Sequence, residues 1–152
     1  MAGDLGDIAR ELGRELGPLR RAVSRATRAA DGLPDLPENQ IEILRTVAAQ
    51  PGIGTSAIAA RIQLSRPTVS NLLATMRRAG LIDLTRPRAD GRLVEASATE
   101  AALSLLDRFD RASEVVIREA LAQLSPAQQR SLGSAMPAIA AMNDVLRRHP
   151  SG

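Results

Sequence analysis

The stretch LSRPTVSNLLATMRRAGLI, residues 64–82, contains the start, the apolar stripe and the end of one amphipathic helix. Ser65 is a residue type that caps helix N-termini, and Pro67 stands in the first turn, where its missing N–H does no harm. Gly80 provides the C-terminal stop. The large apolar residues between these signals are Val69, Leu72, Leu73 and Met76. Their i, i+3, i+4, i+7 spacing predicts a helix over about 66–79 with one face in a core.

The opposite face of this helix carries small hydroxyl and amide groups together with arginine. At 100° per residue it holds Pro67, Ser70, Asn71, Ala74 and Arg78, with Arg66 and Arg77 on one flank and Thr68 on the other. Asparagine can bond bidentately to adenine and arginine to guanine, while threonine and proline can contact the thymine methyl group. Taken alone, such a face is also typical of an ordinary solvated surface helix.

A second, shorter helix is expected just before it. QPGIGT (residues 50–55) ends a helix over about 37–49, and Thr55 is expected as the N-cap of a helix over 56–62. Only residues 63–65 separate this short helix from the one described above. Two short helices joined by such a turn form a helix-turn-helix, whose second helix enters a DNA major groove.

A hairpin is expected directly after the helix-turn-helix. The strand candidates LIDLT (81–85) and LVEAS (93–97) flank RPRADGR (86–92). Asp90-Gly91 predicts a tight turn, because glycine tolerates a positive φ. A hairpin in this position is a wing, and its arginines indicate either a well-solvated loop or a tip that reaches an anionic partner.

The charge of the chain is concentrated in the same region. The net charge is +3, but residues 61–92 hold seven arginines and two acids, a net of +5, whereas the other 120 residues carry 13 arginines and 15 acids, a net of −2. A basic centre between slightly acidic arms indicates a local anionic partner. Combined with the helix-turn-helix and the hairpin, it favours nucleic-acid binding over a plain surface helix.

The composition excludes several other classes of function. Cysteine is absent, which excludes disulfides, thiolate metal sites and a thiol redox sensor. The single histidine is His149, and no glycine-rich phosphate loop accompanies it, so we expect no enzyme, no metal site and no cofactor. One phenylalanine, with no tyrosine or tryptophan, argues against base stacking on single strands. The lack of an apolar run near 18 residues or a secretory signal predicts a soluble, cytoplasmic protein without membrane contact.

Long helices are expected on both sides of the centre. We expect one or two helices over 4–30, one from about 100 to 123 capped by Ser97 or Thr99, and one from the Ser-Pro-Ala-Gln start at 125 to about 148. Pro18 is expected to kink or restart the first helix and Pro137 to kink the last. Their apolar stripes exceed what one small winged domain can cover, which indicates a partner, with an ordinary monomeric helical core as the alternative.

The stretch LPENQIEILRTVAAQPGIGTSAIAARIQLSRPTVSNLLATMRRAGLI and the following RPRADGRLVEASATE resemble the MarR family of winged helix-turn-helix regulators. The resemblance covers about residues 36–102. Asp90-Gly91-Arg92 is similar to the family's Asp-x-Arg wing tip, and residues 98–100 to its Leu-Thr-Glu helix start. The chain departs from the family in having Pro37 where Ser or Thr is common, Ala98 for Leu, Ala101-Ala102 without the usual Gly, and Pro137.

The resemblance implies a mainly α fold with a small β-hairpin wing, in a single domain over 1–152. The winged helix-turn-helix would span 37–98, and dimerisation helices would span 4–30 and 100–148. It also implies a homodimer that reads a pseudo-palindromic operator in double-stranded DNA, as a repressor that responds to a small-molecule effector. The alternative is a dimeric winged-helix module that binds an acidic protein surface instead.

The residues expected to act are assigned as follows. Thr55 and Ser56 would contact backbone phosphate, and Arg86, Arg88 and Arg92 would serve the wing, with Arg92 in the minor groove. Asp90 would brace the wing and Gly91 would close its turn. The expected major-groove residues are Ser65, Arg66, Pro67, Thr68, Ser70, Asn71, Arg77 and Arg78. The expected dimerisation residues are Leu5, Ile8, Leu12, Leu16, Val116, Leu121, Leu124, Ile139, Met142 and Leu146.

Overall fold

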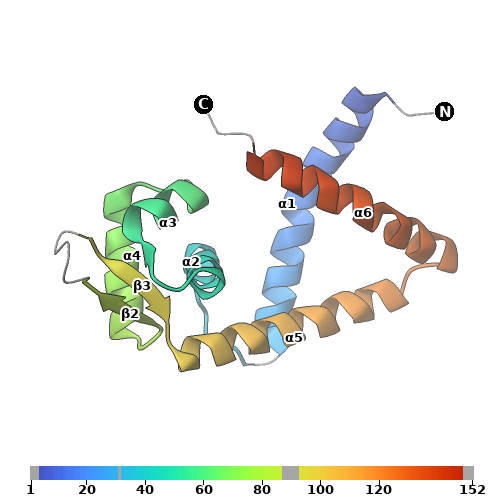
Figure 1. The fold of residues 1–152 in the computed structure, drawn as a ribbon. Helices are drawn as coiled ribbons and strands as arrows, with labels where there is room; N and C mark the ends of the chain where they lie inside the picture. The colour runs from blue at the N-terminus through green and yellow to red at the C-terminus, as the bar shows by residue number, and fades with distance from the viewer. Residues whose placement is uncertain (1–3, 31, 87–92, 149–152) are drawn as a thin grey trace. The chain divides into compact units, whose positions relative to one another are not determined.

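The structure, a computed structural model, describes residues 4–30, 32–86 and 93–148 of the chain. In chain order its elements are α1 (Leu5–Ala30), α2 (Glu38–Ala49), β1 (Ile53–Gly54), α3 (Thr55–Ile62), α4 (Arg66–Arg78), β2 (Ile82–Thr85), β3 (Glu95–Ala98), α5 (Glu100–Ala122) and α6 (Pro126–Arg148) (Figure 1). Helices predominate and the strands form one small antiparallel sheet. The predicted fold class, mainly α with a hairpin wing and flanking helices, is confirmed.

The chain forms two compact units, one up to Ser113 and the other from Glu114 onward. The first unit contains α1 to α4, the sheet and the first part of α5. The second contains the end of α5 and all of α6.

The core of the first unit lies between α2, α3, α4 and the sheet. Its largest fully buried side chains are Ile43, Leu44, Val47, Ile53, Ile58, Val69, Leu73, Met76 and Ile82. The contribution of α4 is the predicted stripe, with Leu72 half-buried at its edge. Because this stripe is buried, the rotation of α4 about its own axis is set by packing.

The sheet has the strand order β1-β3-β2, and β3 pairs antiparallel with both neighbours. Ala96 of β3 lies opposite Ile53 on one side and Leu84 on the other. The strand β1 was not predicted, because two residues are too few to show the alternation of a strand. The backbone N–H of Gly52, at a φ of 81°, donates to the Ala96 carbonyl oxygen at 3.0 Å. The 50–55 segment therefore ends α2 and also joins the sheet.

The two ends of α4 follow the signals that predicted them. The Ser65 Oγ accepts a hydrogen bond from the backbone N–H of Thr68 at 3.2 Å. At the other end, Gly80 has a φ of 73° and follows the C-cap residue Ala79. The N–H groups of the two residues after that cap, Gly80 and Leu81, donate to carbonyl oxygens of the last turn at 3.0 and 2.9 Å, which is the Schellman pattern.

The structure corrects one predicted helix cap and decides between the two candidates for another. Gly54, not Thr55, is the N-cap of α3, and Thr55 is its first residue, with only 8% of its surface exposed. For α5 the cap is Thr99, whose Oγ1 accepts from the Ala102 N–H at 3.2 Å. The Ser97 hydroxyl instead accepts from the Gly52 N–H at 3.2 Å within the sheet region. In both cases, pairing of the segment with a strand far away in the sequence determines which of two nearby residues caps the helix.

The capping box at the start of α6 is present. The backbone N–H of Ser125 donates to Gln128 Oε1 at 2.9 Å, and the Gln128 N–H donates back to Ser125 Oγ at 3.3 Å. Pro18 lies inside α1 and Pro137 inside α6, so neither proline ends its helix. The expectation that Pro18 starts a new helix is therefore wrong.

Thr99 joins the end of the α4 region to the start of α5. Its Oγ1 donates to the Gly80 carbonyl oxygen at 2.7 Å in addition to capping α5. We expect Thr99→Val to lower the free energy of unfolding by about 1–2 kcal/mol, because a cap is lost and a carbonyl loses its partner. Chemical denaturation would measure this. The control is Thr46→Val, whose hydroxyl bonds only to the carbonyl one turn earlier, that of Glu42. Equal losses in both variants would contradict the assignment.

Candidate nucleic-acid interface

The short helices α3 and α4 are joined by the turn at residues 63–65. Gln63 ends α3 with a φ of 55°, in the left-handed region, and its N–H donates to the Ala59 carbonyl oxygen. The Leu64 N–H donates to the same carbonyl at 3.1 Å. The left-handed residue turns the chain so that Ser65 can cap α4 immediately afterwards. The predicted helix-turn-helix is thereby confirmed as a structural unit.

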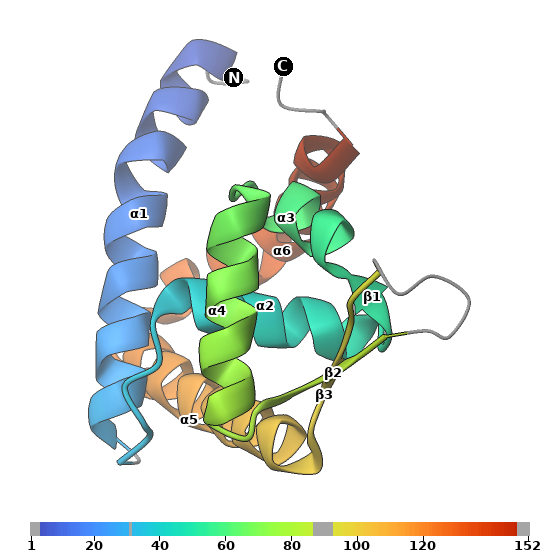
Figure 2. The ribbon, with the colours of Figure 1, turned by 90° about the vertical axis from the view of Figure 1, so that its left-hand side faces the viewer.

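The exposed face of α4 contains the side chains predicted there except Ala74, which is half-buried. Its exposed members are Arg66, Pro67, Thr68, Ser70, Asn71, Thr75, Arg77 and Arg78. Thr75 was missed by the sequence analysis, although it lies one turn after Asn71. In Figure 2 α4 faces the viewer, with the β2–β3 hairpin at its side. Packing of the stripe on α2, α3 and the sheet therefore leaves one continuous polar and basic face.

Several hydrogen bonds orient side chains on or near this face. The hydroxyl oxygens of Ser65 and Thr68 lie 2.6 Å apart, and Arg78 Nη2 donates to Thr75 Oγ1 at 3.2 Å. Arg61, at the end of α3, donates to Gln50 Oε1 at 2.7 Å. The pair Arg61–Gln50 spans 11 residues of sequence and had no signal in the local pattern. Arg61 was counted in the basic charge but was not among the predicted contacts.

The electrostatics of this face are set by arginine. Neither Arg66 nor Arg77 forms an ion pair with any residue in the described ranges. Among the described residues, the nearest acids along the chain are exposed Asp83 on β2 and half-buried Glu95 on β3. Both lie on the hairpin, not on α4. The positive charge of α4 is therefore left available to an external anion.

The two residues expected at the α3 N-terminus differ in accessibility. Thr55 is buried and its N–H donates to the Val94 carbonyl oxygen at 3.3 Å, which ties α3 to the hairpin. Ser56 is exposed. Of this pair, only Ser56 has a side chain open to a phosphate.

The strands of the wing are present as β2 and β3, with Thr85 opposite Glu95 in the register. Arg86 is exposed at the end of the described part of β2. The other predicted wing residues, namely Arg88, Asp90, Gly91 and Arg92, lie outside the described residues. The assignments made to them stay predictions.

A family model described as MarR family matches residues 32–93, which hold the helix-turn-helix and the hairpin up to its second strand. Over residues 32–93 the chain is therefore similar to the MarR family. The sequence resemblance is thereby confirmed. MarR-family proteins are transcriptional regulators, so the expectation that the chain is not an enzyme is confirmed as well.

Similarities to individual proteins extend the comparison beyond the matched segment. The chain is 27% identical over 106 residues to the uncharacterized HTH-type transcriptional regulator Mb0904 of Mycobacterium bovis, covering 70% of this chain and 74% of the relative. In fold it is similar to RV1404 of Mycobacterium tuberculosis, with a TM-score of 0.78, 16% identity, and 94% and 97% of the two chains covered. It is also similar to Streptococcus pneumoniae FabT, solved in complex with DNA, with a TM-score of 0.68, 15% identity, and coverage of 94% and 99%. The likeness to these solved structures shows the fold over almost the whole chain.

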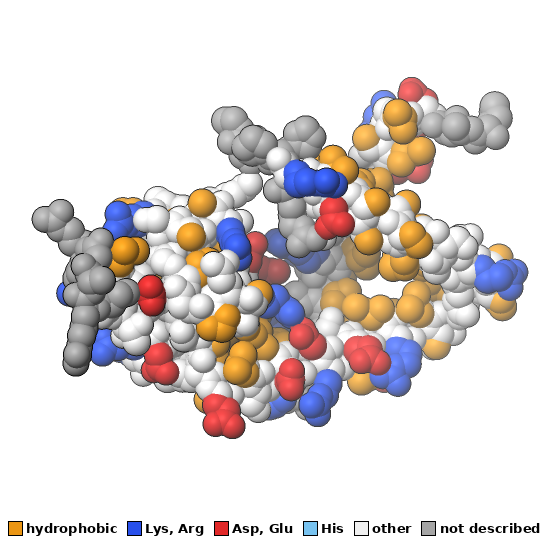
Figure 3. Space-filling view, in the orientation of Figure 1, with side chains coloured by type: hydrophobic (Ala, Val, Ile, Leu, Met, Phe, Trp, Pro, Cys, Tyr) orange, Lys and Arg blue, Asp and Glu red, His pale blue; other side chains and the backbone are white. Residues whose placement is uncertain are grey.

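Outside the MarR-family segment, apolar side chains remain exposed on the flanking helices. On α1, Leu5 is 82% exposed, and Ile8 and Leu16 are also exposed. On the end of α5 and on α6, Leu121, Ile139 and Leu146 are exposed, and Figure 3 shows hydrophobic side chains along both segments. The half-buried members of the predicted dimerisation set are Leu12, Val116, Leu124 and Met142. Within the described chain, much of the predicted set is therefore uncovered.

A pocket of about 440 Å³ lies in the first unit, between α1, α2 and α5. Its lining is Leu16, Leu19, Arg20, Val23, Ser24, Thr27, Glu38, Ile41, Arg45, Phe109 and Ser113. Thr27 is 4% exposed, and its Oγ1 has no hydrogen-bond partner among the described residues. Arg45 Nη2 bonds to Asp110 Oδ1 at 2.5 Å, which ties α2 to α5. The pocket thus combines an apolar body with one orphaned hydroxyl.

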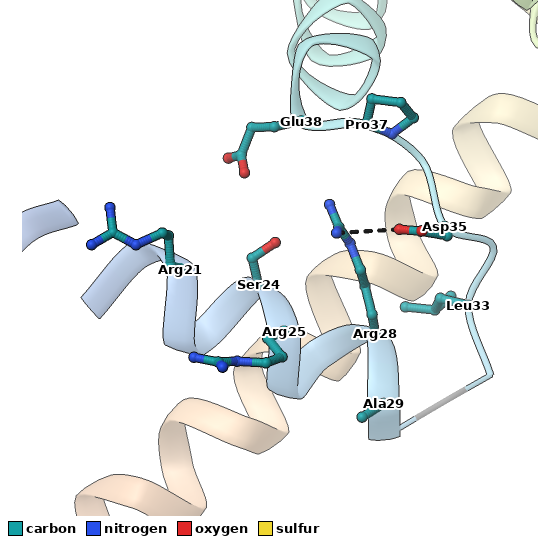
Figure 4. A pocket seen from close by; sticks show the side chains of 9 residues that line it. All are labelled: Arg21, Ser24, Arg25, Arg28, Ala29, Leu33, Asp35, Pro37 and Glu38. Carbon is teal, nitrogen blue, oxygen red and sulfur yellow. Dashed lines mark ion pairs between the residues drawn. The ribbon is translucent and has the colours of Figure 1, made fainter. Parts of the chain in front are cut away.

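A second pocket, of about 690 Å³, lies where α1 meets the start of α2. In Figure 4 the polar ends of Ser24, Arg28 and Glu38 point toward one another, whereas Arg21 and Arg25 extend to one side. Arg28 Nη1 lies 3.2 Å from an Asp35 carboxylate oxygen, and its Nη2 donates to the Leu36 carbonyl oxygen at 3.0 Å. Arg28 therefore links α1 to the connection that precedes α2.

Within residues 4–30, 32–86 and 93–148, no cluster of three or more His, Asp or Glu side chains could hold a metal ion. Over those same ranges, no helix has the length and apolarity needed to cross a membrane.

Thr27 offers a direct test of the first pocket. A buried hydroxyl without a partner costs about 1–3 kcal/mol of desolvation. We expect Thr27→Val, which keeps the shape and removes the hydroxyl, to raise the free energy of unfolding by about 1 kcal/mol. Denaturant titration of the full chain would measure this, with Thr46→Val as the matched control because the Thr46 hydroxyl has a partner. A destabilised Thr27→Val variant would show that the hydroxyl is satisfied.

Proposed function

We propose that the chain is a sequence-specific repressor that binds double-stranded DNA as a homodimer and responds to a small-molecule effector in the cytoplasm. The observation that carries this proposal is the exposed face of α4, which is basic, free of acids and rich in groups that pair with base edges. The MarR-family match over 32–93 supports it, as does the similarity in fold to FabT, solved in complex with DNA.

In the proposal α4 lies in the major groove. Asn71 pairs with a base edge, and Arg66, Arg77 and Arg78 bond to guanine or to phosphate. Ser65, Pro67, Thr68 and Ser70 complete the contact surface at the start of the helix. Ser56 at the start of α3 contacts backbone phosphate through its side chain, while buried Thr55 positions the helix.

The wing provides the second contact in the proposal. Arg86 lies on the phosphate side of the hairpin, Arg88 adds charge further along it, and Arg92 enters the minor groove. Asp90 braces the tip and Gly91 closes its turn. The support for this role is that β2 contacts α4 directly, so the hairpin starts beside the recognition surface.

The homodimer is supported by the uncovered apolar surface of α1, α5 and α6. Leu5 and Leu146 are 82% and 62% exposed, far more than large apolar residues in a finished core. Large apolar surface left exposed on helices marks protein–protein contacts. Two winged units related by a two-fold axis would read a pseudo-palindromic operator.

The effector is supported by the pocket between α1, α2 and α5. A mostly apolar pocket with a few polar groups is typical of a small-molecule site. It adjoins α2, a core helix of the winged unit, and Thr27, whose unpaired Oγ1 is buried, is among its lining residues. A ligand that fills this pocket would change the contact between α1 and α2.

The alternative function is a dimeric winged-helix module whose arginines bind an acidic protein surface. Selection of DNA from a random pool, followed by titration over a salt series, separates the two. The proposal requires a retained sequence preference together with a steep loss of affinity as salt rises. Weak, salt-sensitive binding with no preferred sequence would favour the protein-binding alternative.

Asn71 tests the base-reading role of α4. On the selected operator, we expect Asn71→Ala to weaken binding by about 1–3 kcal/mol and to relax the preference at one base pair in each half-site. The slope of affinity against salt should stay unchanged because asparagine is neutral. Asn143→Ala, an equally exposed asparagine on α6, is the control. An Asn71→Ala variant that keeps the full preference would remove Asn71 from the site.

Leu146 tests the dimer. We expect Leu146→Glu to shift the sedimentation equilibrium from dimer toward monomer, because a charge then has to be buried in an apolar contact. Leu93→Glu is the matched control, since Leu93 is a comparably exposed leucine on the hairpin side of the chain. A monomeric wild type, or equal effects of the two substitutions, would contradict the dimer assignment.

A further inference from the structure

We infer that Thr68 selects a thymine through its γ-methyl group and not through its hydroxyl. The inference rests on the proposed DNA-binding function. It adds to that function the group of the Thr68 side chain that contacts the DNA and the group of the base that it contacts. The inference follows from the hydrogen bond between the hydroxyl of Ser65, the N-cap residue of α4, and the hydroxyl of Thr68.

The Ser65 side chain controls the orientation of Thr68. Ser65 Oγ accepts the Thr68 backbone N–H at 3.2 Å and lies 2.6 Å from Thr68 Oγ1, a normal length for a hydroxyl–hydroxyl hydrogen bond. Either hydroxyl can be the donor in this pair. In both cases Thr68 Oγ1 is directed back toward the start of the helix and is already paired.

Thr68 is nevertheless an exposed side chain on the first turn of α4. The threonine Cβ carries one hydroxyl and one methyl group. Because the hydroxyl is held toward Ser65, the methyl is the group of this side chain that has no partner within the protein. Exposed Pro67 lies next to it in the sequence and adds a second apolar surface at the same end of the helix.

The chemistry of such a surface identifies its target. Among base edges in the major groove, only thymine presents an apolar group, its C5 methyl. A hydrogen bond from Thr68 to a base edge would have to share an oxygen that is already bonded to Ser65 and directed toward it. The geometry therefore favours methyl–methyl contact over hydrogen-bond readout at this position.

The test compares protein and DNA variants that each lack one methyl group. Operators selected by the full-length wild type are remade with deoxyuridine in place of each thymine in turn, which removes only the C5 methyl. The dissociation constants of wild type, Thr68→Val and Thr68→Ser are then measured on each operator. Thr68→Val keeps the methyl and Thr68→Ser keeps the hydroxyl. The Ser65 cap to the Thr68 backbone N–H needs neither group, so both variants should fold, which circular dichroism would check.

At one thymine in each half-site, we expect uracil to weaken binding by wild type and by Thr68→Val about three- to tenfold, the range expected for burial of one methyl-sized group. Thr68→Ser should bind the thymine operator that much more weakly and should not distinguish uracil from thymine. Thr75→Val, a change of the same kind on the same helix, should keep the uracil effect.

Two results would overturn the inference on its own. One is that Thr68→Val loses affinity for the thymine operator while Thr68→Ser keeps it. The other is that no uracil substitution separates wild type from Thr68→Ser. A wild type that selects no sequence from the pool would instead overturn the proposed function, and the inference with it. The two failures are distinguished by whether the selection of DNA succeeds.

Discussion

Burial of the apolar stripe of α4 is the constraint on which the rest of the account depends. Val69, Leu73 and Met76 are essentially inaccessible to solvent in the core formed with α2, α3 and the sheet. Since a helix has only one rotation that buries a given stripe, this packing alone turns Ser70 and Asn71 outward. The exposed polar face of α4 is therefore a consequence of core packing, and no further interaction is needed to orient it.

The ends of the same helix are held as firmly as its middle. Ser65 caps its start, and the Schellman turn at Gly80 ends it within one residue of the sheet. Thr99 then bonds to the Gly80 carbonyl and caps α5, so the hairpin leaves and returns at one corner of the first unit. A recognition surface needs this kind of rigid support, because a side chain that reads a base edge must be positioned to a fraction of an ångström.

The features that could be predicted from the sequence are those with local signals. The cap, stripe and stop of α4 lie within one short stretch, and all of them are present. The features that were missed depend on residues far apart in the chain. Whether Ser97 or Thr99 caps α5, and why Thr55 is buried, depends on pairing of the 50–55 segment with β3, which no periodicity shows. The bond from Arg61 to Gln50 has the same origin, whereas Thr75 could have been found from its spacing after Asn71.

Cross-linking from a single cysteine would test the central claim most directly, because the chain contains no cysteine of its own. A short photoreactive group would be attached to Ser70→Cys and, as a control, to Ser104→Cys, an exposed position on α5. Each labelled protein would then be irradiated on the selected operator. The account predicts that the label at position 70 cross-links to bases from the major groove, while the label at position 104 does not. Cross-linking from position 104 alone would show that α4 is not the helix that reads DNA.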